Sequence, residues 1–531
     1  MTAPFTAETA ESIARARTHA VGDLLRRTAL RYPDKLAVVA GERRVTFAEF
    51  DVAVNRAAHA LADRGLGKGD RLALLAHNSW QYVVLAFATA RLGVVLVPIN
   101  FMLGAEEIAF ILEHSGAAGM VAEDTLTATA EAALAAASIE GGVRGRIGGA
   151  SGGWEDIDGW WTAGPDHAPD VLVGDDDPIR LMYTSGTESR PKGVILTSRS
   201  LIAQYVSCVI DGEMGVDDIE VHSLPLYHCA QLDCFLSVDV YLGATSIVLP
   251  GPDPAALLAT IEREGATKLF CPPTVWISLL RHPDFDTRDL STLRKGYYGA
   301  SAMPVEVLKE LQQRLPDVAF WNFYGQTEMA PLATILRPHE QLPRAGSAGR
   351  PSINVETRLV DDDDRPVSPG QVGEIVHRSP HAALGYYNDE QKTADAFRGG
   401  WFHSGDLGVM SEDGYLSVVD RKKDMIKTGG ENVASREVEE VIYQLDGVAE
   451  VAVFGINHPT WIEAVTAVVV PKPGASLTAE AVSAHVREHL AGYKRPKYVV
   501  FAESLPKNPS GKILKRELRD RHAGLAAAPE S

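Results

Sequence analysis

Residues 70–100, DRLALLAHNSWQYVVLAFATARLGVVLVPIN, predict the fold class of this chain. DRLALLAHN is typical of a short buried strand, QYVVLAFATARLG of a helix, and VVLVPIN of a second strand. This order predicts a βαβ unit, whose two strands lie parallel in one sheet. Arg91 and Pro98 interrupt the apolar run, so we expect a buried helix and strand rather than a segment that spans a bilayer.

The same alternation continues on both sides of this stretch. Residues 44–66 have the pattern of an amphipathic helix. Three short apolar runs have the length and composition of buried strands: GMVAEDT (119–125), SIVLP (246–250) and ATKLFCP (266–272). The glycine-rich residues 141–153, GGVRGRIGGASGG, are expected to form a surface loop. We therefore predict an α/β body of stacked βαβ-type sheets over residues 1–420.

The character of the sequence changes after Asp420. Residues 421–433, RKKDMIKTGGENV, are basic and contain glycine, as expected of an ordered hinge. Beyond the hinge, EVEEVIYQL and AEAVSAHVREHL have helical patterns, whereas EVAVFGI and EAVTAVVVP are typical of strands. We therefore predict a second domain at residues 421–531, a small α+β cap.

Composition excludes several classes of protein. The chain has 531 residues, with 45% hydrophobic and 23% charged side chains, which is the composition of a globular protein. Its formal net charge of −19 argues against nucleic acid or a basic membrane anchor as the basis of function. Four cysteines without zinc-ligand spacing form neither a disulfide framework nor a metal motif. No signal peptide is visible at the N-terminus, so we expect a cytoplasmic location and no integral membrane segment.

A loop rich in hydroxyl groups joins two apolar strands at residues 183–193, YTSGTESRPKG. Backbone N–H groups, hydroxyls and the Lys192 ammonium of such a loop can surround phosphate oxygens. The loop lacks the G-x-x-x-x-G-K-[ST] spacing, and a strand rather than a helix follows it, so it is no Walker A motif. A polar hairpin turn with an incidental lysine explains the same residues equally well.

Three further motifs follow in order along the chain. Residues 322–328, NFYGQTE, combine an aromatic ring, a hydroxyl and a carboxylate that is suited to Mg²⁺. Residues 401–406, WFHSGD, are followed by Asp420 and Arg421, and a carboxylate beside a guanidinium can bind the two hydroxyls of a ribose. Residues 506–512, PKNPSGK, place a lysine on a tight turn near the C-terminus.

Taken together, these motifs resemble those of the adenylate-forming superfamily, which includes acyl- and aryl-CoA synthetases, firefly-type luciferases and peptide-synthetase adenylation domains. The resemblance extends from about Ala20 to Arg519. It implies a two-step reaction with ATP, Mg²⁺ and coenzyme A as cofactors. A carboxylate attacks the α-phosphate of ATP to give an acyl-adenylate and pyrophosphate. The small domain then rotates, and a thiol attacks the acyl carbon and releases AMP.

The resemblance also implies roles for individual residues. Catalytic and metal-binding roles fall to Lys512 near the substrate carboxylate and α-phosphate, Thr327 at the α-phosphate, and Glu328 with Thr184 at Mg²⁺. Nucleotide and coenzyme binding falls to a larger set: Thr184, Ser185, Gly186, Thr187 and Lys192 at the phosphates, Gly299, Ala300, Ser301, Asn322 and Tyr324 around adenine, Asp406 and Arg421 at the ribose, Lys423 at the hinge, Lys427 near the nucleotide or thiol, and Gly430 at the pantetheine tunnel.

One motif departs from the superfamily pattern. Its phosphate loop usually contains a second threonine followed by glycine, where this chain has Glu188 and Ser189. Losing a glycine restricts the backbone, and a carboxylate repels pyrophosphate unless it points to solvent. The other motifs are intact, so the expected activity stands.

The acid-binding pocket is less clearly defined by sequence. His228 matches a gating histidine of related ligases, although a hydrogen-bonded core histidine is the commoner role for a lone residue of this type. Tyr298 and Met329 are further expected substrate contacts. The apolar residues nearby suit a medium- or long-chain fatty acid, which we expect, and also an aryl or cinnamyl-type acid.

We therefore predict an ATP-dependent, AMP-forming ligase that joins a small carboxylic acid to CoA. One alternative is an acyl- or aryl-AMP ligase that passes its product to a carrier protein or another nucleophile. A second alternative, of a different class, is a binding protein that retains the fold without the chemistry. The oligomeric state stays open, with a dimer among the options.

Overall fold

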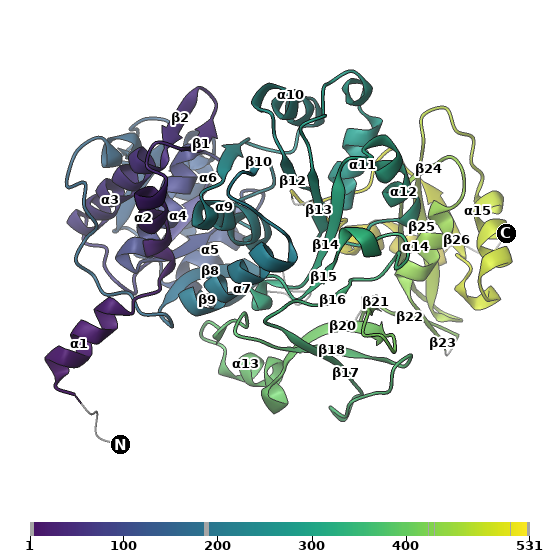
Figure 1. Cartoon of the computed structure of the whole chain (residues 1–531). Coiled ribbons are helices and arrows are strands. Elements are labelled where there is room, and N and C mark those ends of the chain that lie inside the picture. Colours follow the sequence, from purple (N-terminus) through teal and green to yellow (C-terminus); the bar gives the residue numbers. More distant parts are fainter. Residues whose placement is uncertain (1–4, 185–190, 423, 430, 510, 528–531) are drawn as a thin grey trace.

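The computed structural model describes residues 5–184, 191–422, 424–429, 431–509 and 511–527. The chain forms a large α/β body and a smaller C-terminal unit, which lies at one end of the body and is coloured yellow and light green in Figure 1. This arrangement confirms the expected fold class. The predicted boundary between residues 420 and 421 stays a prediction; the last strand of the body ends at Arg421.

Two large sheets make up most of the body in the described residues. The first has the strand order β16 (Arg350–Pro351), β15 (Thr334–Leu336), β14 (Ala319–Tyr324), β13 (Lys295–Gly299), β12 (Lys268–Phe270), β10 (Ile219–His222), β11 (Thr245–Val248), β1 (Leu36–Ala40), β2 (Arg43–Thr46). The second has the order β19 (Gly385–Tyr386), β9 (Lys192–Thr197), β8 (Pro178–Thr184), β4 (Val95–Pro98), β3 (Arg71–Leu75), β5 (Gly119–Glu123), β6 (Val143–Ile147), β7 (Glu155–Asp156).

The central strands of both sheets run parallel, as the βαβ pattern predicts. The chain reverses only toward the sheet edges, for example where β9 pairs antiparallel with β8. A third, antiparallel sheet contains β17 (Glu356–Val360), β18 (Val372–Arg378), β20 (Phe402–Met410) and β21 (Leu416–Arg421). It carries the chain from the body toward the C-terminal unit.

Helices fill the spaces between and around the sheets. They are α1 (Ala7–Ala16), α2 (Val21–Arg31), α3 (Phe47–Asp63), α4 (Trp80–Leu92), α5 (Ala105–Ser115), α6 (Thr127–Ala136), α7 (Ser198–Asp211), α8 (Cys229–Gln231), α9 (Ser237–Leu242), α10 (Pro254–Glu264), α11 (Pro273–Arg281), α12 (Val305–Arg314) and α13 (Glu390–Ala396). One apolar core contains residues of α2, α3, α4, α7 and α9 together with strands of both large sheets, so these helices join the sheets.

Local signals explain where helices α3 and α4 begin. Thr46 and Glu49 form a capping box at the start of α3. The Ser79 side chain accepts a hydrogen bond from the Tyr82 N–H and caps α4. Helix α4 is buried almost throughout and passes directly into β4, as the apolar sequence predicts. None of the helices in the described residues is both long and apolar enough to cross a membrane.

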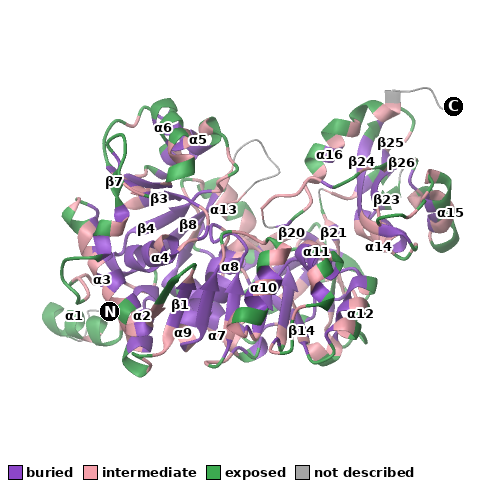
Figure 2. Cartoon of the chain, turned by 90° about the horizontal axis from the view of Figure 1, so that it is seen from above, coloured by how far each residue is buried: buried purple, intermediate pink, exposed green. Residues whose placement is uncertain are grey.

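The C-terminal unit, which we call the cap, has its own core. Its sheet contains β23 (Glu431–Val433), β22 (Ile426–Thr428), β25 (Ile462–Pro471), β24 (Val448–His458) and β26 (Tyr498–Phe501), and its helices are α14 (Ser435–Tyr443), α15 (Ala479–His489) and α16 (Lys515–His522). Apolar residues cluster on both faces of this sheet, and Figure 2 shows the buried strands with the more exposed helices α15 and α16 around them. The predicted helices and strands of the cap are therefore confirmed.

One prediction about the body was wrong. Residues 141–153 are not a loop throughout, because Val143–Ile147 form strand β6 in the second sheet. Val143, Gly145 and Ile147 alternate inward, which is the pattern of a half-buried strand. A Cβ at Gly145 would lie 2.6 Å from Ile157 and 2.8 Å from Trp160, so the glycine here permits close packing rather than a turn.

Candidate nucleotide and acid site

One cavity of about 780 Å³ lies at the carboxyl ends of β8, β13 and β14, where the body meets the cap. Ligand sites in parallel sheets form at this edge because the loops after the strands converge there. Eleven of the predicted site residues line the cavity: Thr184, Lys192, His228, Gly299, Ala300, Tyr324, Thr327, Glu328, Asp406, Arg421 and Lys512.

A hydrogen-bonded group around Asp406 forms one end of the cavity. The Tyr324 hydroxyl donates to Asp406 Oδ2 at 2.8 Å, and Gln326 Nε2 donates to the same oxygen at 3.1 Å. Arg421 Nε lies 3.5 Å from Asp406 Oδ1, because the two residues are directly opposed across β20 and β21. Burial and the Asp406 charge raise the pKa of Tyr324, so the phenol remains a donor. The adjacent carboxylate and guanidinium can bind a pair of neighbouring hydroxyl groups.

The hairpin of β8 and β9 forms the next part of the wall. Thr184 and Lys192 oppose each other at the loop end of this hairpin, so the hydroxyl and the ammonium face one region of the cavity. The predicted phosphate contacts Ser185, Gly186 and Thr187 lie between them, outside the described residues. A hydroxyl and an ammonium on either side of such a loop can bind phosphate oxygens.

Glu328 and Thr184 provide oxygen ligands of the kind that Mg²⁺ prefers. Glu328 accepts a hydrogen bond from the Tyr386 hydroxyl through Oε1 at 2.8 Å, which leaves Oε2 for a cation. The residues present therefore fit a magnesium ion bound together with a triphosphate. The ion would neutralise charge on the phosphates.

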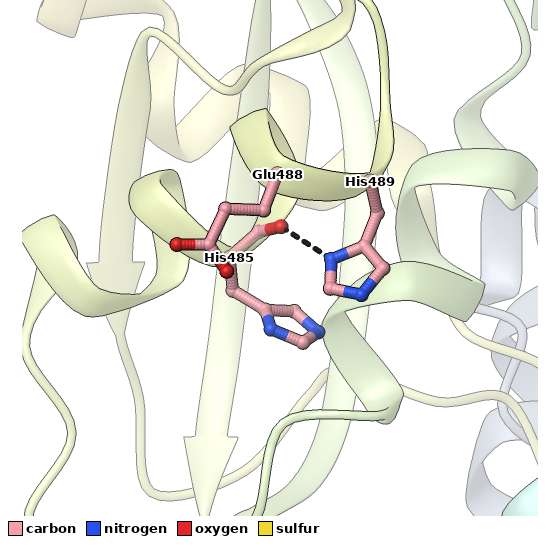
Figure 3. Close-up of side chains that lie close together, drawn as sticks. All are labelled: His485, Glu488 and His489. Carbon is pink, nitrogen blue, oxygen red and sulfur yellow. Dashed lines mark hydrogen bonds between the residues drawn. The ribbon is translucent and has the colours of Figure 1, made fainter.

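Two other groups of potential metal ligands lie away from this cavity. On α15 of the cap, His485, Glu488 and His489 are close together, and the His489 ring pairs with the backbone oxygen of His485 at 2.8 Å (Figure 3). In the core of the body, Glu220, His222 and Asp239 are near one another, but the Lys268 ammonium lies 2.8 Å from Glu220 and already occupies the space between the carboxylates. Neither group adds a ligand to the described lining of the cavity.

The cap supplies Lys512 to the cavity. The turn that carries it docks on the body, since the Thr274 hydroxyl donates to the Gly511 carbonyl at 2.9 Å. Burial together with the Lys512 charge lowers the pKa of His228 to about 4, so this histidine is neutral at pH 7. A neutral imidazole beside an ammonium suits a carboxylate that binds between them.

Apolar and aromatic side chains form the remaining arm of the cavity, which we call the acyl arm. Phe235, Phe270 and Phe323 line it, and the Phe235 ring stacks on Phe270 with centroids 4.2 Å apart and on Phe323 with centroids 5.7 Å apart. The buried Tyr297 ring packs behind Phe235 and Phe323. Further lining residues of this arm are Leu224, Cys229, Gln231, Cys234, Pro331 and Leu332.

Several predicted site residues are not part of this described lining. Tyr298 and Asn322 oppose each other across β13 and β14, on the sheet face away from Gly299 and Phe323. The Tyr298 hydroxyl donates to Gln341, and Asn322 donates to the Ser347 carbonyl. Three others lie elsewhere: Met329 is buried in a separate apolar cluster, Ser301 is exposed, and Lys427 is exposed on β22. Lys423 and Gly430 lie outside the described residues.

The structure also brings in residues that sequence reasoning did not select. Gln326 was inside a recognised motif, but its bond to Asp406 depends on where β20 lies. Tyr386 comes from a short strand at a sheet edge, and no local pattern marks it as a partner of Glu328. The three phenylalanines of the acyl arm belong to separate elements and have no common motif.

Comparisons with known proteins agree with this geometry. Residues 25–387 match the family of AMP-binding enzymes, and residues 437–512 match the C-terminal domain of AMP-binding enzymes. Feruloyl-CoA synthase of an Amycolatopsis species is 38% identical over 95% of this chain and 99% of its own length. A long-chain-fatty-acid–CoA ligase of Salmonella typhimurium is 34% identical over 96% of this chain and 95% of its own.

The crystal structure of the anthranilate CoA ligase AuaEII in complex with anthranoyl-AMP superposes with a TM-score of 0.90 at 27% identity. The match covers 97% of this chain and all of that one. The family match spans more than half of the chain and both of its parts. The chain therefore belongs to the family of AMP-binding enzymes.

Proposed function

We propose that this member of the AMP-binding enzyme family is an AMP-forming acid–CoA ligase whose substrate is an aromatic carboxylic acid. ATP and the acid would first form an acyl-adenylate and pyrophosphate. The thiol of CoA would then displace AMP. The observation that carries the choice of acid is the lining of the acyl arm by stacked aromatic rings.

The shape of the acyl arm favours a flat acid over a long one. Phe235, Phe270 and Phe323 present ring faces and edges, which interact well with another aromatic ring. Fully buried side chains, among them Tyr297 and Trp321, pack behind them, and this dense packing favours a compact, flat acid over an extended alkyl chain. The arm thus supports an aromatic acid rather than the medium- or long-chain fatty acid that sequence favours. The names of the feruloyl- and anthranilate-activating relatives point in the same direction.

The first step joins two anions, so the site must offset their repulsion. Lys512 would stabilise the charge that develops on the α-phosphate as the carboxylate attacks. Arg421 and Asp406 would hold the ribose, and Thr184 and Lys192 the outer phosphates, which orients the α-phosphate toward the acid. Removing one preorganised donor of this type typically lowers the rate by about 10²–10³-fold.

His228 would act at the junction between the acyl arm and the nucleotide. Its ring is neutral at pH 7, so it can donate one hydrogen bond to the acid without adding a second cation beside Lys512. Thr327 is close by, where its hydroxyl accepts a weak bond from Cys229 at 3.5 Å. These two side chains would orient the carboxylate toward the phosphorus.

The test is acid-dependent exchange of labelled pyrophosphate into ATP. The panel should contain benzoic, cinnamic and hydroxycinnamic acids and a series of straight-chain fatty acids of increasing length. We expect exchange with aromatic acids and its decline as alkyl chains lengthen. Preference for long fatty acids would contradict the choice of acid, and no exchange with any acid would contradict the activity.

The acceptor requires a separate measurement. Each active acid is incubated with ATP and either free CoA or a holo carrier protein, and the thioester is identified by mass spectrometry. We expect an acyl-CoA. Product with the carrier protein alone would instead support the acyl-AMP ligase alternative.

A further inference from the structure

A short edge strand attaches Glu328 to the strand that carries Lys192. Strand β19 pairs antiparallel with β9, and the Tyr387 N–H donates to the Gly193 carbonyl at 2.8 Å. Just before β19, the Ala383 N–H donates to the Glu328 carbonyl, also at 2.8 Å. The segment at residues 383–387 therefore fixes the backbone of Glu328 relative to the start of β9.

Tyr386 is the residue of this segment that contacts both charged side chains. Its hydroxyl donates to Glu328 Oε1 at 2.8 Å, and the Lys192 ammonium lies 5.2 Å from its ring centroid. The Tyr386 N–H donates to Thr393 Oγ1 at 2.9 Å, which fixes the residue from the side of α13. Burial and the Glu328 charge raise the pKa of Tyr386, so the phenol keeps its proton.

The opposite charges of Glu328 and Lys192 would attract each other across the cavity that both side chains line. Within the described chain the two side chains form no ion pair, and Tyr386 contacts each of them. An ammonium over a ring face is held by the ring's negative quadrupole. A carboxylate that accepts a phenolic hydrogen bond has a fixed orientation and keeps its second oxygen available.

We propose that Tyr386 is a positioning residue that orients Glu328 for a divalent cation and prevents it from pairing with Lys192. The inference rests on the proposed function, because it concerns the triphosphate end of the same site. Tyr386 performs no step of the reaction itself. It keeps one anionic and one cationic side chain available for the metal and the phosphates.

The test measures binding of a metal rather than turnover. Mn²⁺ replaces Mg²⁺ in oxygen-ligand sites and is detected by electron paramagnetic resonance. The α,β-methylene analogue of ATP supplies the phosphates and cannot form an adenylate. For Tyr386→Phe we expect Mn²⁺ to bind the enzyme–analogue complex about tenfold more weakly, the usual effect of losing one hydrogen bond to a charged group.

AMP binding provides the internal control for folding. AMP lacks the outer phosphates, so Tyr386→Phe should bind it as the wild type does. Tyr387→Phe is the matched control variant, because Tyr387 neighbours Tyr386 but packs near His114 outside the cavity lining. We expect this control to keep the wild-type affinity for Mn²⁺ and for AMP.

A double-mutant cycle distinguishes action through Glu328 from any other effect. In a Glu328→Gln background, Tyr386→Phe should cause no further loss of Mn²⁺ affinity. Unchanged Mn²⁺ affinity in Tyr386→Phe, an equal loss of AMP affinity, or the same loss in the Glu328→Gln background would each overturn the inference. These measurements need no acid substrate. Failure of the proposed function would appear separately, as wild-type enzyme without acid-dependent pyrophosphate exchange.

Discussion

Substitution of Gly511 by alanine should separate the two half-reactions. Gly511 has a φ of +78° and lies in the turn that brings Lys512 to the cavity. A Cβ at this position would lie 2.4 Å from Thr274 Oγ1 and 2.8 Å from Pro272 Cγ. Because a real Cβ tolerates neither distance, the turn has to withdraw from the body, and Lys512 with it. Adenylation should therefore fall, whereas transfer from supplied acyl-adenylate should be largely spared.

The size of the effect follows from two contributions. Withdrawal breaks the 2.9 Å hydrogen bond from Thr274 to the Gly511 carbonyl, which is worth about 1 kcal/mol. Relieving the steric overlap costs about 1 kcal/mol more, at the lower end of overpacking effects. A total of about 2 kcal/mol lowers the population of the docked cap orientation by up to about 30-fold. The left-handed φ costs an additional ~1–2 kcal/mol for alanine. Because this cost applies in either cap orientation, it does not change the balance between the two orientations.

The assay compares pyrophosphate exchange with thioester formation from a synthetic acyl-adenylate. Gly474→Ala is the matched control, since Gly474 lies in the cap with a φ of +79° and has no atom within 4 Å of its Cβ position. Thr274→Val removes only the hydroxyl and should lower exchange about fivefold. The reasoning is refuted if Gly474→Ala loses as much exchange as Gly511→Ala, or if Gly511→Ala impairs both half-reactions equally.

Three further variants test the site from other sides. Lys512→Ala should lower pyrophosphate exchange by about 10²–10³-fold and leave transfer from supplied acyl-adenylate largely intact; equal loss in both assays would contradict its assignment. Phe270→Leu should lower kcat/KM for aromatic acids about 2–10-fold through lost ring contacts but not for short alkyl acids, and a uniform loss would indicate a packing defect instead. His228 has a pKa of about 4 when folded against 6.5 when unfolded, so its neutral form contributes stability above about pH 6.5 that is lost as the pH falls toward 4. The urea midpoint of the wild type should fall between about pH 6.5 and pH 4, and His228→Phe should make this fall less steep. An unchanged slope would contradict the lowered pKa of His228.

That Tyr324, Glu328, Asp406 and Arg421 share one cavity could be predicted from sequence because they lie in short motifs at strand ends. Their roles at a nucleotide stay predictions. Tyr324 is the last residue of β14 and Glu328 follows it, and Asp406 and Arg421 lie opposite each other on a hairpin. The motifs do not specify which face of a strand a residue occupies. The sequence therefore predicts Tyr298 in the pocket. In the structure the Tyr298 hydroxyl bonds to Gln341 on the other face of the strand, and it is the neighbouring Tyr297 that packs on the aromatic rings of the acyl arm.

The acyl arm could not be predicted for a different reason. Phe235, Phe270 and Phe323 come from a helical turn, the end of β12 and β14. They come together because β12 pairs with β13, and β13 with β14, in one parallel sheet. Likewise, Gly145 looked like a loop residue because a missing side chain has the same appearance in a turn and in a tightly packed strand. Close packing at a glycine, and contacts between residues far apart in the sequence, produce no periodic pattern that sequence reasoning can detect.

The chain has a net charge of −19, and acidic side chains also lie among the residues that line the cavity. Several predicted site residues are cations, and three cations of the described cavity lining lie beside carboxylates. Arg421 lies beside Asp406, and Lys422 and Arg398 both lie beside Glu374. A triphosphate that enters such a site has to compete with these carboxylates for the cations. A contact that keeps a cation away from a nearby carboxylate therefore makes that cation more available to phosphate. Tyr386 between Lys192 and Glu328 is positioned to do this at the point where the phosphates and their metal would bind.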